Sequence, residues 1–356
     1  MNKRIQKLRE TLHTKRADGI FIESPTNRRY VSGFTGTSGA MLITEEEAYF
    51  ITDFRYVEQA QDQCDGFHII EQTSSIYNEV GILVKKSGVS RLLFEKEHTT
   101  YAVYELLQKY IQAELIPSAG LVENIRLYKE ANEIEVLKEA AQIADNAFEH
   151  IIKKLKPGVT EMEISNELEF FMRNKGAVSS SFDIIVASGW RGALPHGVAS
   201  DKVIESGELV TMDYGAYYKG YCSDITRTVA VGEPTNELKK IYQCVYEAQI
   251  RAVDAIKPGM SGVEADRIAR EYIEQEGYGD HFGHGLGHGL GMEVHEGPRL
   301  SPKGKNTLEK GMVVTVEPGI YVSGVGGTRI EDDIVLTENG NERLTHSPKE
   351  LTIVGE

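Results

Sequence analysis

Four acidic residues occupy matching positions in two similar stretches of the sequence. Asp213 ends the apolar stretch ELVTMD, and Glu317 ends the related stretch MVVTVE, 104 positions further along the chain. A second acid follows soon after each: Asp224 in YCSDITRTV and Glu331 in TRIEDDIVL. A single acid here would more often cap a turn or face solvent. Four carboxylates brought together would repel one another unless cations compensated them, so the symmetric pairs predict a site for two divalent metal ions.

A glycine-rich run supplies histidines that could join these acids. GHGLGHGLG, at 283–291, has glycine at every odd position, and five glycines disfavour a helix by about 1 kcal/mol each. An extended backbone would place four side chains on one side: His284, Leu286, His288 and Leu290. Glycine also permits close approach of neighbouring backbone. An isolated histidine is commonly a buried hydrogen-bonding residue, but the nearby His295 and the similar context of His196 favour histidines that face a cleft.

Four carboxylates and one imidazole form an oxygen-rich ligand set. Such a set favours Mn²⁺, Co²⁺, Fe²⁺ or Zn²⁺ over thiolate-binding ions, and the histidine argues against Mg²⁺. Among these ions, we expect manganese to be the native metal. Two ions roughly 3.5–4 Å apart would share a bridging hydroxide that attacks a carbonyl without a covalent enzyme intermediate. The sequence has no HExxH, P-loop or GxSxG motif that would indicate another chemistry.

The elements that must position these residues belong to a duplicated segment. LKPGVTEMEI at 155–164 returns as IKPGMSGVEA at 256–265. A period of this length is too long for a solenoid and predicts two similar halves, each a pair of helices followed by strands, packed around a pseudo-two-fold axis. A long amphipathic helix should begin near Asn132, which could serve as its N-cap.

The first part of the chain has a different pattern and predicts a small α/β domain. Ile5, Leu8 and Leu12 lie on one helical stripe. The stretches GIFIES, AMLIT, AYFIT and SRLLFE read as strands, and a helix should start near Asp53. We therefore expect two domains, at residues 1–125 and 126–356.

Composition excludes several classes of function. The chain has 356 residues, of which 40% are hydrophobic and 26% charged, and its net charge of −15 disfavours nucleic-acid or anionic-membrane partners. No apolar stretch approaches the length of about 18 residues expected for a membrane span, and the N-terminus lacks a signal-peptide pattern. The three cysteines, Cys64, Cys222 and Cys244, form no disulfide pattern, so a cytoplasmic protein is expected.

The motifs together resemble those of the pita-bread dinuclear metallopeptidases, which include methionine aminopeptidase, Xaa-Pro aminopeptidase and prolidase. TMDYGAYYKGYCSDITRT, GHGLGHGLGMEVHEGP, TVEPGIY and TRIEDD look like the metal-site motifs of that family. NRRYVSGFTG and TDFRY resemble the N-terminal domain of its prolidase and creatinase branch. The resemblance implies an α/β (α+β) protein with a creatinase-like N-terminal domain and a pita-bread catalytic domain.

The same resemblance implies a role for each candidate residue. Asp213 would be a bidentate ligand of one metal, Asp224 and Glu331 would bridge both metals, and His288 and Glu317 would complete the other, with Glu317 also moving the proton. His196 and His295 would bind substrate and stabilise the tetrahedral intermediate, and His284 would lie nearby in the cleft. Arg329, two residues before Glu331, should lie on the same strand face and orient the carboxylates. Arg299 could hold a substrate carboxylate.

The expected activity is metal-dependent hydrolysis of the Xaa-Pro bond of a small peptide with proline at its second position, by an Xaa-Pro dipeptidase (prolidase). This bond lacks an N–H, so a small apolar pocket for the proline ring is the natural recognition device. An Xaa-Pro aminopeptidase acting on longer peptides is the nearest alternative. A creatinase-like hydrolase without metal and a non-catalytic binding protein of the same fold are further alternatives, which the complete ligand set disfavours. The resemblance also implies a homodimer.

Overall fold

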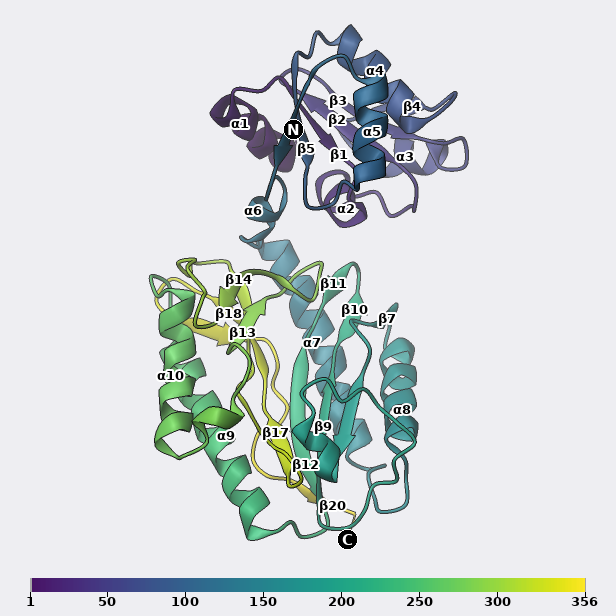
Figure 1. Cartoon of the computed structure of the whole chain (residues 1–356). Helices are drawn as coiled ribbons and strands as arrows, with labels where there is room; N and C mark the ends of the chain where they lie inside the picture. Colours follow the sequence, from purple (N-terminus) through teal and green to yellow (C-terminus); the bar gives the residue numbers. More distant parts are fainter. Residues whose placement is uncertain (1, 356) are drawn as a thin grey trace. The chain divides into compact units, whose positions relative to one another are not determined.

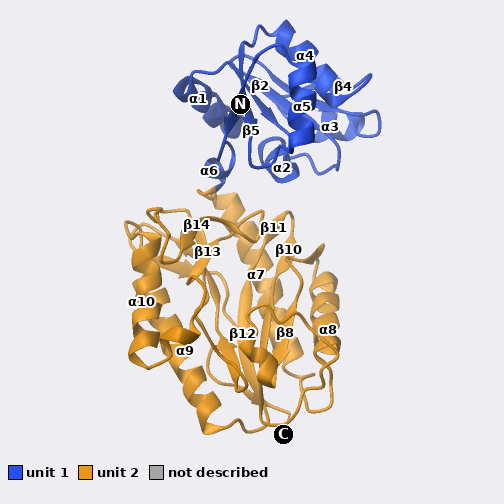
Figure 2. Cartoon of the chain, in the orientation of Figure 1, with its two compact units in different colours: residues 1–126 blue, residues 127–356 orange. Residues whose placement is uncertain are grey.

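The structure is a computed structural model that describes residues 2–355 (Figure 1). The chain divides into two compact units, residues 1–126 and 127–356 (Figure 2). Each unit has its own hydrophobic core. In the described residues, no helix is both long and apolar enough to cross a membrane.

The first unit is a mixed sheet with helices, in the strand order β4-β3-β2-β1-β5-β6. Its elements are α1 (Lys3–Lys15), β1 (Gly19–Ile22), α2 (Pro25–Ser32), β2 (Ala40–Thr44), β3 (Ala48–Thr52), α3 (Val57–Gln63), β4 (His68–Glu71), α4 (Ile76–Lys86), β5 (Arg91–Glu95), α5 (Tyr101–Tyr110), β6 (Glu114–Ser118) and α6 (Glu123–Arg126). The four predicted strands are confirmed as β1, β2, β3 and β5. Ile5, Leu8 and Leu12 are buried along α1, as the helical stripe predicted.

Both predicted N-caps are wrong, although the long helix does begin next to Asn132. Helix α3 begins at Val57 after the N-cap position Tyr56, because the carboxylate of Asp53 instead accepts hydrogen bonds from Arg55, at 2.8 Å from Nε and 2.9 Å from Nη2. The long helix α7 (Ala131–Ile151) follows Glu130, not Asn132. The Glu133 carboxylate accepts a hydrogen bond from the backbone N–H of Glu130 at 2.9 Å, which fixes the start there.

The second unit repeats one order of elements. The first half contains α7, α8 (Glu161–Asn174), β7 (Ser179–Ser180), β8 (Ile185–Ser188), the 3₁₀ turn η1 (Gly189–Ala193), β9 (Glu208–Tyr214), β10 (Ala216–Tyr218), β11 (Tyr221–Cys222) and β12 (Ile225–Val231). The second contains α9 (Asn236–Ala255), α10 (Gly262–Gln275), η2 (Gly279–His281), β13 (Gly287–Gly289), β14 (Glu296–Leu300), β15 (Val313–Val316), β16 (Gly319–Val322), β17 (Gly326–Arg329) and β18 (Asp332–Leu336). Strands β19 (Asn341–Arg343) and β20 (Ile353–Val354) follow. The predicted order of two helices and then strands is confirmed in both halves.

The repeated sequence motif marks the same structural feature twice. Thr160 caps α8 in a capping box with Glu163, and Ser261 caps α10 in the same way with Glu264. Downstream, β9 pairs antiparallel with β12, and β15 pairs antiparallel with β18. In Figure 1, α8 lies on one side of the strands of this unit, and α9 and α10 lie on the other. The duplication therefore builds two equivalent strand pairs whose ends carry the acids.

Candidate metal centre

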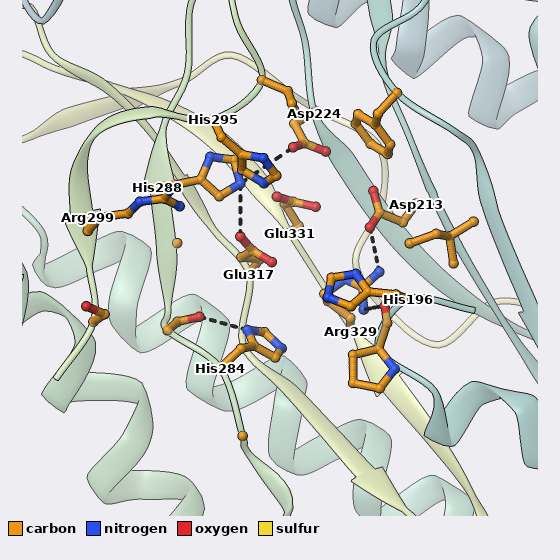
Figure 3. Close-up of a pocket in the computed structure, with 18 of the residues that line it drawn as sticks. His196, Asp213, Asp224, His284, His288, His295, Arg299, Glu317, Arg329 and Glu331 are labelled. Atoms are coloured by element: carbon orange, nitrogen blue, oxygen red, sulfur yellow. Dashed lines mark hydrogen bonds and ion pairs between the residues drawn. The ribbon is translucent and has the colours of Figure 1, made fainter. Parts of the chain in front are cut away.

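The four acids lie at corresponding ends of the two strand pairs. Asp213 is near the end of β9, in register with Thr226 of β12, and Asp224 immediately precedes β12. Glu317 follows β15, and Glu331 immediately precedes β18. The backbone N–H of Glu331 donates to Thr226 O at 3.1 Å, so the two halves are joined here. All four carboxylates line one cavity of about 730 Å³ (Figure 3).

His288 is presented by the short strand β13. Its Nδ1 is 3.1 Å from Gly289 O, so Nδ1 carries the proton and Nε2 is left to act as a ligand. Nε2 lies 3.3 Å from Glu317 Oε1 and 3.8 Å from Asp224 Oδ2. Ligand atoms of Asp224, His288 and Glu331 all lie within 4.8 Å of one another, and all three residues are buried.

The glycines beside His288 allow neighbouring backbone to approach. A Cβ on Gly287 would lie 2.1 Å from Thr315 O, and one on Gly289 would lie 1.7 Å from Gly297 O. The expected close approach is therefore confirmed. Continuous alternation along the run is not, because only Gly287–Gly289 forms a strand and its pairing with β14 shifts register after His288. His284 and His288 line the cavity, whereas Leu286 and Leu290 belong to hydrophobic cores.

The carboxylates of the site repel one another, and some of their buried oxygens have no hydrogen-bond partner among the described residues. Within residues 2–355, the buried oxygens Oδ1 of Asp213 and Oδ1 of Asp224 have no hydrogen-bond partner. Burial, followed by repulsion from Glu331 and Asp213, raises the pKa of Asp224 well above its usual range. Burial and the charges of Glu317 and Asp213 do the same for Glu331. Unpartnered buried carboxylate oxygens next to an imidazole nitrogen are a donor set that fits divalent cations.

Asp213 and Glu317 have different charged neighbours from Asp224 and Glu331. The Arg329 guanidinium donates to Asp213 Oδ2 at 2.5 Å. Burial raises the pKa of Glu317, but the nearby His288 outweighs it and lowers this pKa to about 2. The prediction that Arg329 and Glu331 share one strand is wrong, since Arg329 ends β17 and Glu331 lies between β17 and β18. Both side chains nevertheless point into the cavity (Figure 3).

Tyr321, in β16, connects Arg329 with His284 and was not singled out from the sequence. Arg329 Nη1 donates to the Tyr321 hydroxyl at 2.9 Å. His284 Nδ1 is 2.8 Å from Gly285 O and therefore donates to it, so the Tyr321 hydroxyl donates to His284 Nε2 at 2.8 Å. Burial raises the pKa of Tyr321 to about 12, which keeps this donor protonated. The ring of His284 is thus oriented through Tyr321 by the arginine that holds Asp213.

Replacing Tyr321→Phe should lower the free energy of unfolding of the metal-free protein by about 1–3 kcal/mol, because the buried guanidinium of Arg329 and the partly buried imidazole of His284 each lose a partner. Urea denaturation followed by circular dichroism measures this change. Tyr246→Phe is the matched control, since the Tyr246 hydroxyl makes a long contact of 3.5 Å with Glu350 near the surface. Equal midpoints for both variants would show that the Arg329–Tyr321–His284 chain contributes nothing to stability.

The remaining candidate residues line the same cavity. His295 and His288 meet edge to face with 4.4 Å between ring centroids, and burial followed by the His288 charge lowers the pKa of His295. Arg299 of β14 lies directly opposite His288 of β13 in this antiparallel strand pair. His196 is exposed in the segment after η1. Sequence reasoning missed several further lining residues, which stand in ordinary apolar or turn segments: Phe182, Asp183, Ile185, Val198, Val294 and Ser301.

Comparisons with known proteins agree with this architecture. Residues 135–338 match the model of Metallopeptidase family M24, and residues 4–128 match the Creatinase/Prolidase N-terminal domain. A solved Xaa-Pro dipeptidase from Bacillus anthracis is 57% identical, with a TM-score of 0.98 and 99% of each chain covered. An Xaa-Pro dipeptidase of Pyrococcus furiosus is 40% identical over 99% of this chain and 100% of its own. A solved X-Pro aminopeptidase from Thermotoga maritima is 40% identical, with a TM-score of 0.90, and the match covers 96% of this chain and 100% of the other.

A site of four carboxylates and one imidazole, built at equivalent strand ends of a duplicated domain, thus coincides with matches that extend over nearly the whole chain. The chain belongs to metallopeptidase family M24 and carries a creatinase/prolidase-type N-terminal domain.

Proposed function

We propose that this protein hydrolyses the Xaa-Pro bond of dipeptides with a pair of divalent cations. The observation that carries the proposal is the convergence of four carboxylates and Nε2 of His288 on one cavity, with unpartnered buried oxygens on Asp213 and Asp224. Full-length similarity to proteins named Xaa-Pro dipeptidase supports this choice of substrate.

Five residues would hold the metals. We assign this role to Asp213, Asp224, His288, Glu317 and Glu331. Bound cations of this kind supply a nucleophile from water at neutral pH and polarise the scissile carbonyl. We propose manganese as the native metal, because oxygen ligands dominate and one imidazole is present.

Glu317 has one oxygen left for proton transfer. Its Oε1 accepts a hydrogen bond from Thr315 Oγ1 at 3.2 Å and lies 3.3 Å from His288 Nε2. We therefore assign Oε2 to accept the proton of the attacking water and to return it to the proline nitrogen, which becomes the leaving amine. His196 and His295 stand on the cavity wall, where they can donate to the carbonyl oxygen as negative charge develops.

The cavity wall also suits a proline dipeptide. Apolar side chains contribute to it from both halves: Phe182, Ile185, Pro195, Val198 and Val294. Such a surface can hold a pyrrolidine ring, which has no N–H to recognise. Arg299 on the same wall can pair with the C-terminal carboxylate of a dipeptide.

Three finer assignments accompany the proposal. We propose a homodimer, as the family resemblance implies, and a cytoplasmic location, with which three free, buried cysteines are compatible. We also propose that function divides at the predicted boundary, with residues 1–125 as the creatinase/prolidase-like domain and residues 126–356 as the catalytic domain.

Metal removal and a graded set of peptides test the proposal together. Dialysis against a chelator should abolish cleavage of Leu-Pro, and Mn²⁺ should restore it. Leu-Pro should be cleaved at least about tenfold faster than Leu-Pro-Ala, because Arg299 can pair with a free C-terminal carboxylate only when it directly follows proline. Leu-Ala is the control peptide and should not be cleaved.

Xaa-Pro aminopeptidase activity remains the second candidate, favoured by the full-length likeness to the Thermotoga maritima enzyme. Faster cleavage of Leu-Pro-Ala than of Leu-Pro would decide for it. Turnover of creatine in the presence of chelator would instead support a metal-free creatinase-like hydrolase, and failure to cleave any of these compounds would support a binding protein.

A further inference from the structure

One buried carboxylate outside the proposed metal site joins both ends of the segment that carries His196. Glu161 is the first residue of α8, and it is fully buried. Its Oε1 accepts hydrogen bonds from the N–H and hydroxyl of Ser188, at 2.8 and 2.9 Å. Its Oε2 accepts from the N–H and hydroxyl of Ser200, at 3.1 and 2.6 Å. Thus a single side chain closes a loop, residues 188–200, with His196 inside it.

Two arginines extend this hold to the residues around His196. Arg191 pairs with Glu161 through Nη1 and donates from Nη2 to Val198 O at 2.9 Å. From the opposite half, Arg329 Nη1 donates to Pro195 O at 3.2 Å. The carbonyl just before His196 and a carbonyl two residues after it are therefore both fixed by guanidinium groups. One of these guanidiniums also holds Asp213.

The middle of the loop is fixed by backbone contact. A Cβ on Gly192 would lie 3.1 Å from Gly327 N, and a Cβ on Gly327 would lie 2.2 Å from Gly192 O. Gly192 of η1 therefore packs directly on β17, the strand that ends at Arg329. The loop is attached at its two ends, at its centre and on both sides of His196.

The imidazole of His196 contrasts with this fixed backbone. It is exposed on the cavity wall, and it has no hydrogen-bond or ion-pair partner among residues 2–355. A residue with an immobilised backbone and an uncommitted ring can meet a ligand without first giving up a partner or ordering a loop. We propose that Glu161 and Arg191 are positioning residues. They fix the backbone of His196 so that its imidazole ring can contact the scissile carbonyl. This assignment rests on the proposed function.

The duplicated half supports the idea that this helix start serves the cavity. The residue equivalent to Glu161 in the repeat is Gly262, the first residue of α10. A Cβ there would lie 2.0 Å from Arg299 O, so α10 packs directly against the strand that carries Arg299. The same helix end therefore supports a cavity-wall residue in each half, by backbone contact in one and by a carboxylate clamp in the other.

Glu161→Gln tests the clamp, because the amide cannot accept from all of these donors and loses the charge that pairs with Arg191. We expect kcat for Leu-Pro to fall about 10- to 100-fold, as for displacement of a catalytic group by up to about 1 Å, with KM changed less than threefold and two metal ions per chain retained. Glu163→Gln is the matched control. It removes the same charge in the same turn of α8, but Glu163 is exposed, and its side-chain hydrogen bonds are to Thr160, so kcat should stay within about twofold.

A double-mutant cycle separates positioning from general damage to the fold. If Glu161 acts through His196, adding Glu161→Gln to His196→Ala should change kcat less than about twofold further. If Glu161→Gln fails to fold, Ser200→Ala removes the 2.6 Å hydroxyl contact with Glu161, together with a 3.2 Å hydrogen bond that Ser200 Oγ accepts from Lys202 N. It should lower kcat about three- to tenfold, again only when His196 is present.

Three results would overturn the assignment: an unchanged kcat in both clamp variants, a full additional loss in the His196→Ala background, or an equal loss in Glu163→Gln. These differ from failure of the proposed function, which would appear as no cleavage of Leu-Pro by the unmodified, manganese-loaded protein and would remove both proposals together.

Discussion

Asp224→Asn should lower the rate of Leu-Pro cleavage by at least about 1,000-fold and, at the same time, stabilise the metal-free protein. The rate falls because a proposed metal ligand would be lost, together with a negative charge that would hold the cations in the site. Stability rises because Asp224 is buried with an unpartnered oxygen and is repelled by Glu331 and Asp213. An amide removes this repulsion while keeping the shape of the side chain.

Calorimetry with and without Mn²⁺ measures both halves of this prediction. In chelator, the melting temperature of Asp224→Asn should exceed that of the unmodified protein by about 2–4 °C for each kcal/mol gained. Addition of Mn²⁺ should raise the melting temperature of the unmodified protein and leave the variant almost unchanged. Asp201→Asn, at an exposed acid, is the control and should alter neither value. A metal-free Asp224→Asn protein that melts earlier than the unmodified one would refute the repulsion argument.

Arg329→Met should lower the free energy of unfolding by about 3–5 kcal/mol and cleavage of Leu-Pro by at least about 100-fold. The guanidinium is buried and donates to Asp213, Tyr321 and Pro195 O. Without it, the largely buried Asp213 side chain loses its arginine partner, and the loop of His196 loses one of its attachments. A methionine fills a similar volume, so the cost comes mainly from polar groups left without partners.

Urea denaturation at a fixed Mn²⁺ concentration gives the stability change, and elemental analysis shows whether the metals remain. Arg267→Met is the control, because Arg267 forms a surface pair with Glu271 at 3.8 Å, for which a change below about 1 kcal/mol is expected. If Arg329→Met unfolded at the same urea concentration as this control, Arg329 would have no part in holding the site.

The positions of the acids could be inferred from the sequence because the duplication is written into it. Each acid stands next to an apolar strand, and the same strand pair occurs twice, so the symmetry of the sequence gives the symmetry of the site. The glycines next to His288 could be interpreted for a similar local reason, since only a residue without Cβ tolerates backbone at about 2 Å from that position.

The supporting residues could not be inferred, because their partners are distant in sequence. Glu161 forms hydrogen bonds with Ser188 and Ser200, and Tyr321 forms one with His284. These partners are far apart in the sequence, so no local sequence pattern predicts the contacts. The two N-caps were wrong for a different, local reason. Asp53 is a good N-cap by type, but its carboxylate accepts hydrogen bonds from Arg55, two residues away, and Glu133 closes a capping box on Glu130 instead of leaving Asn132 as the cap.

Titration of the metal-free protein with Mn²⁺, followed by calorimetry and by Leu-Pro cleavage on the same samples, tests the central claim most directly. The structure predicts two bound ions per chain and cleavage that appears as the sites fill. Undiminished cleavage by protein shown to contain no divalent metal, or active protein that binds none of the added Mn²⁺, would contradict it.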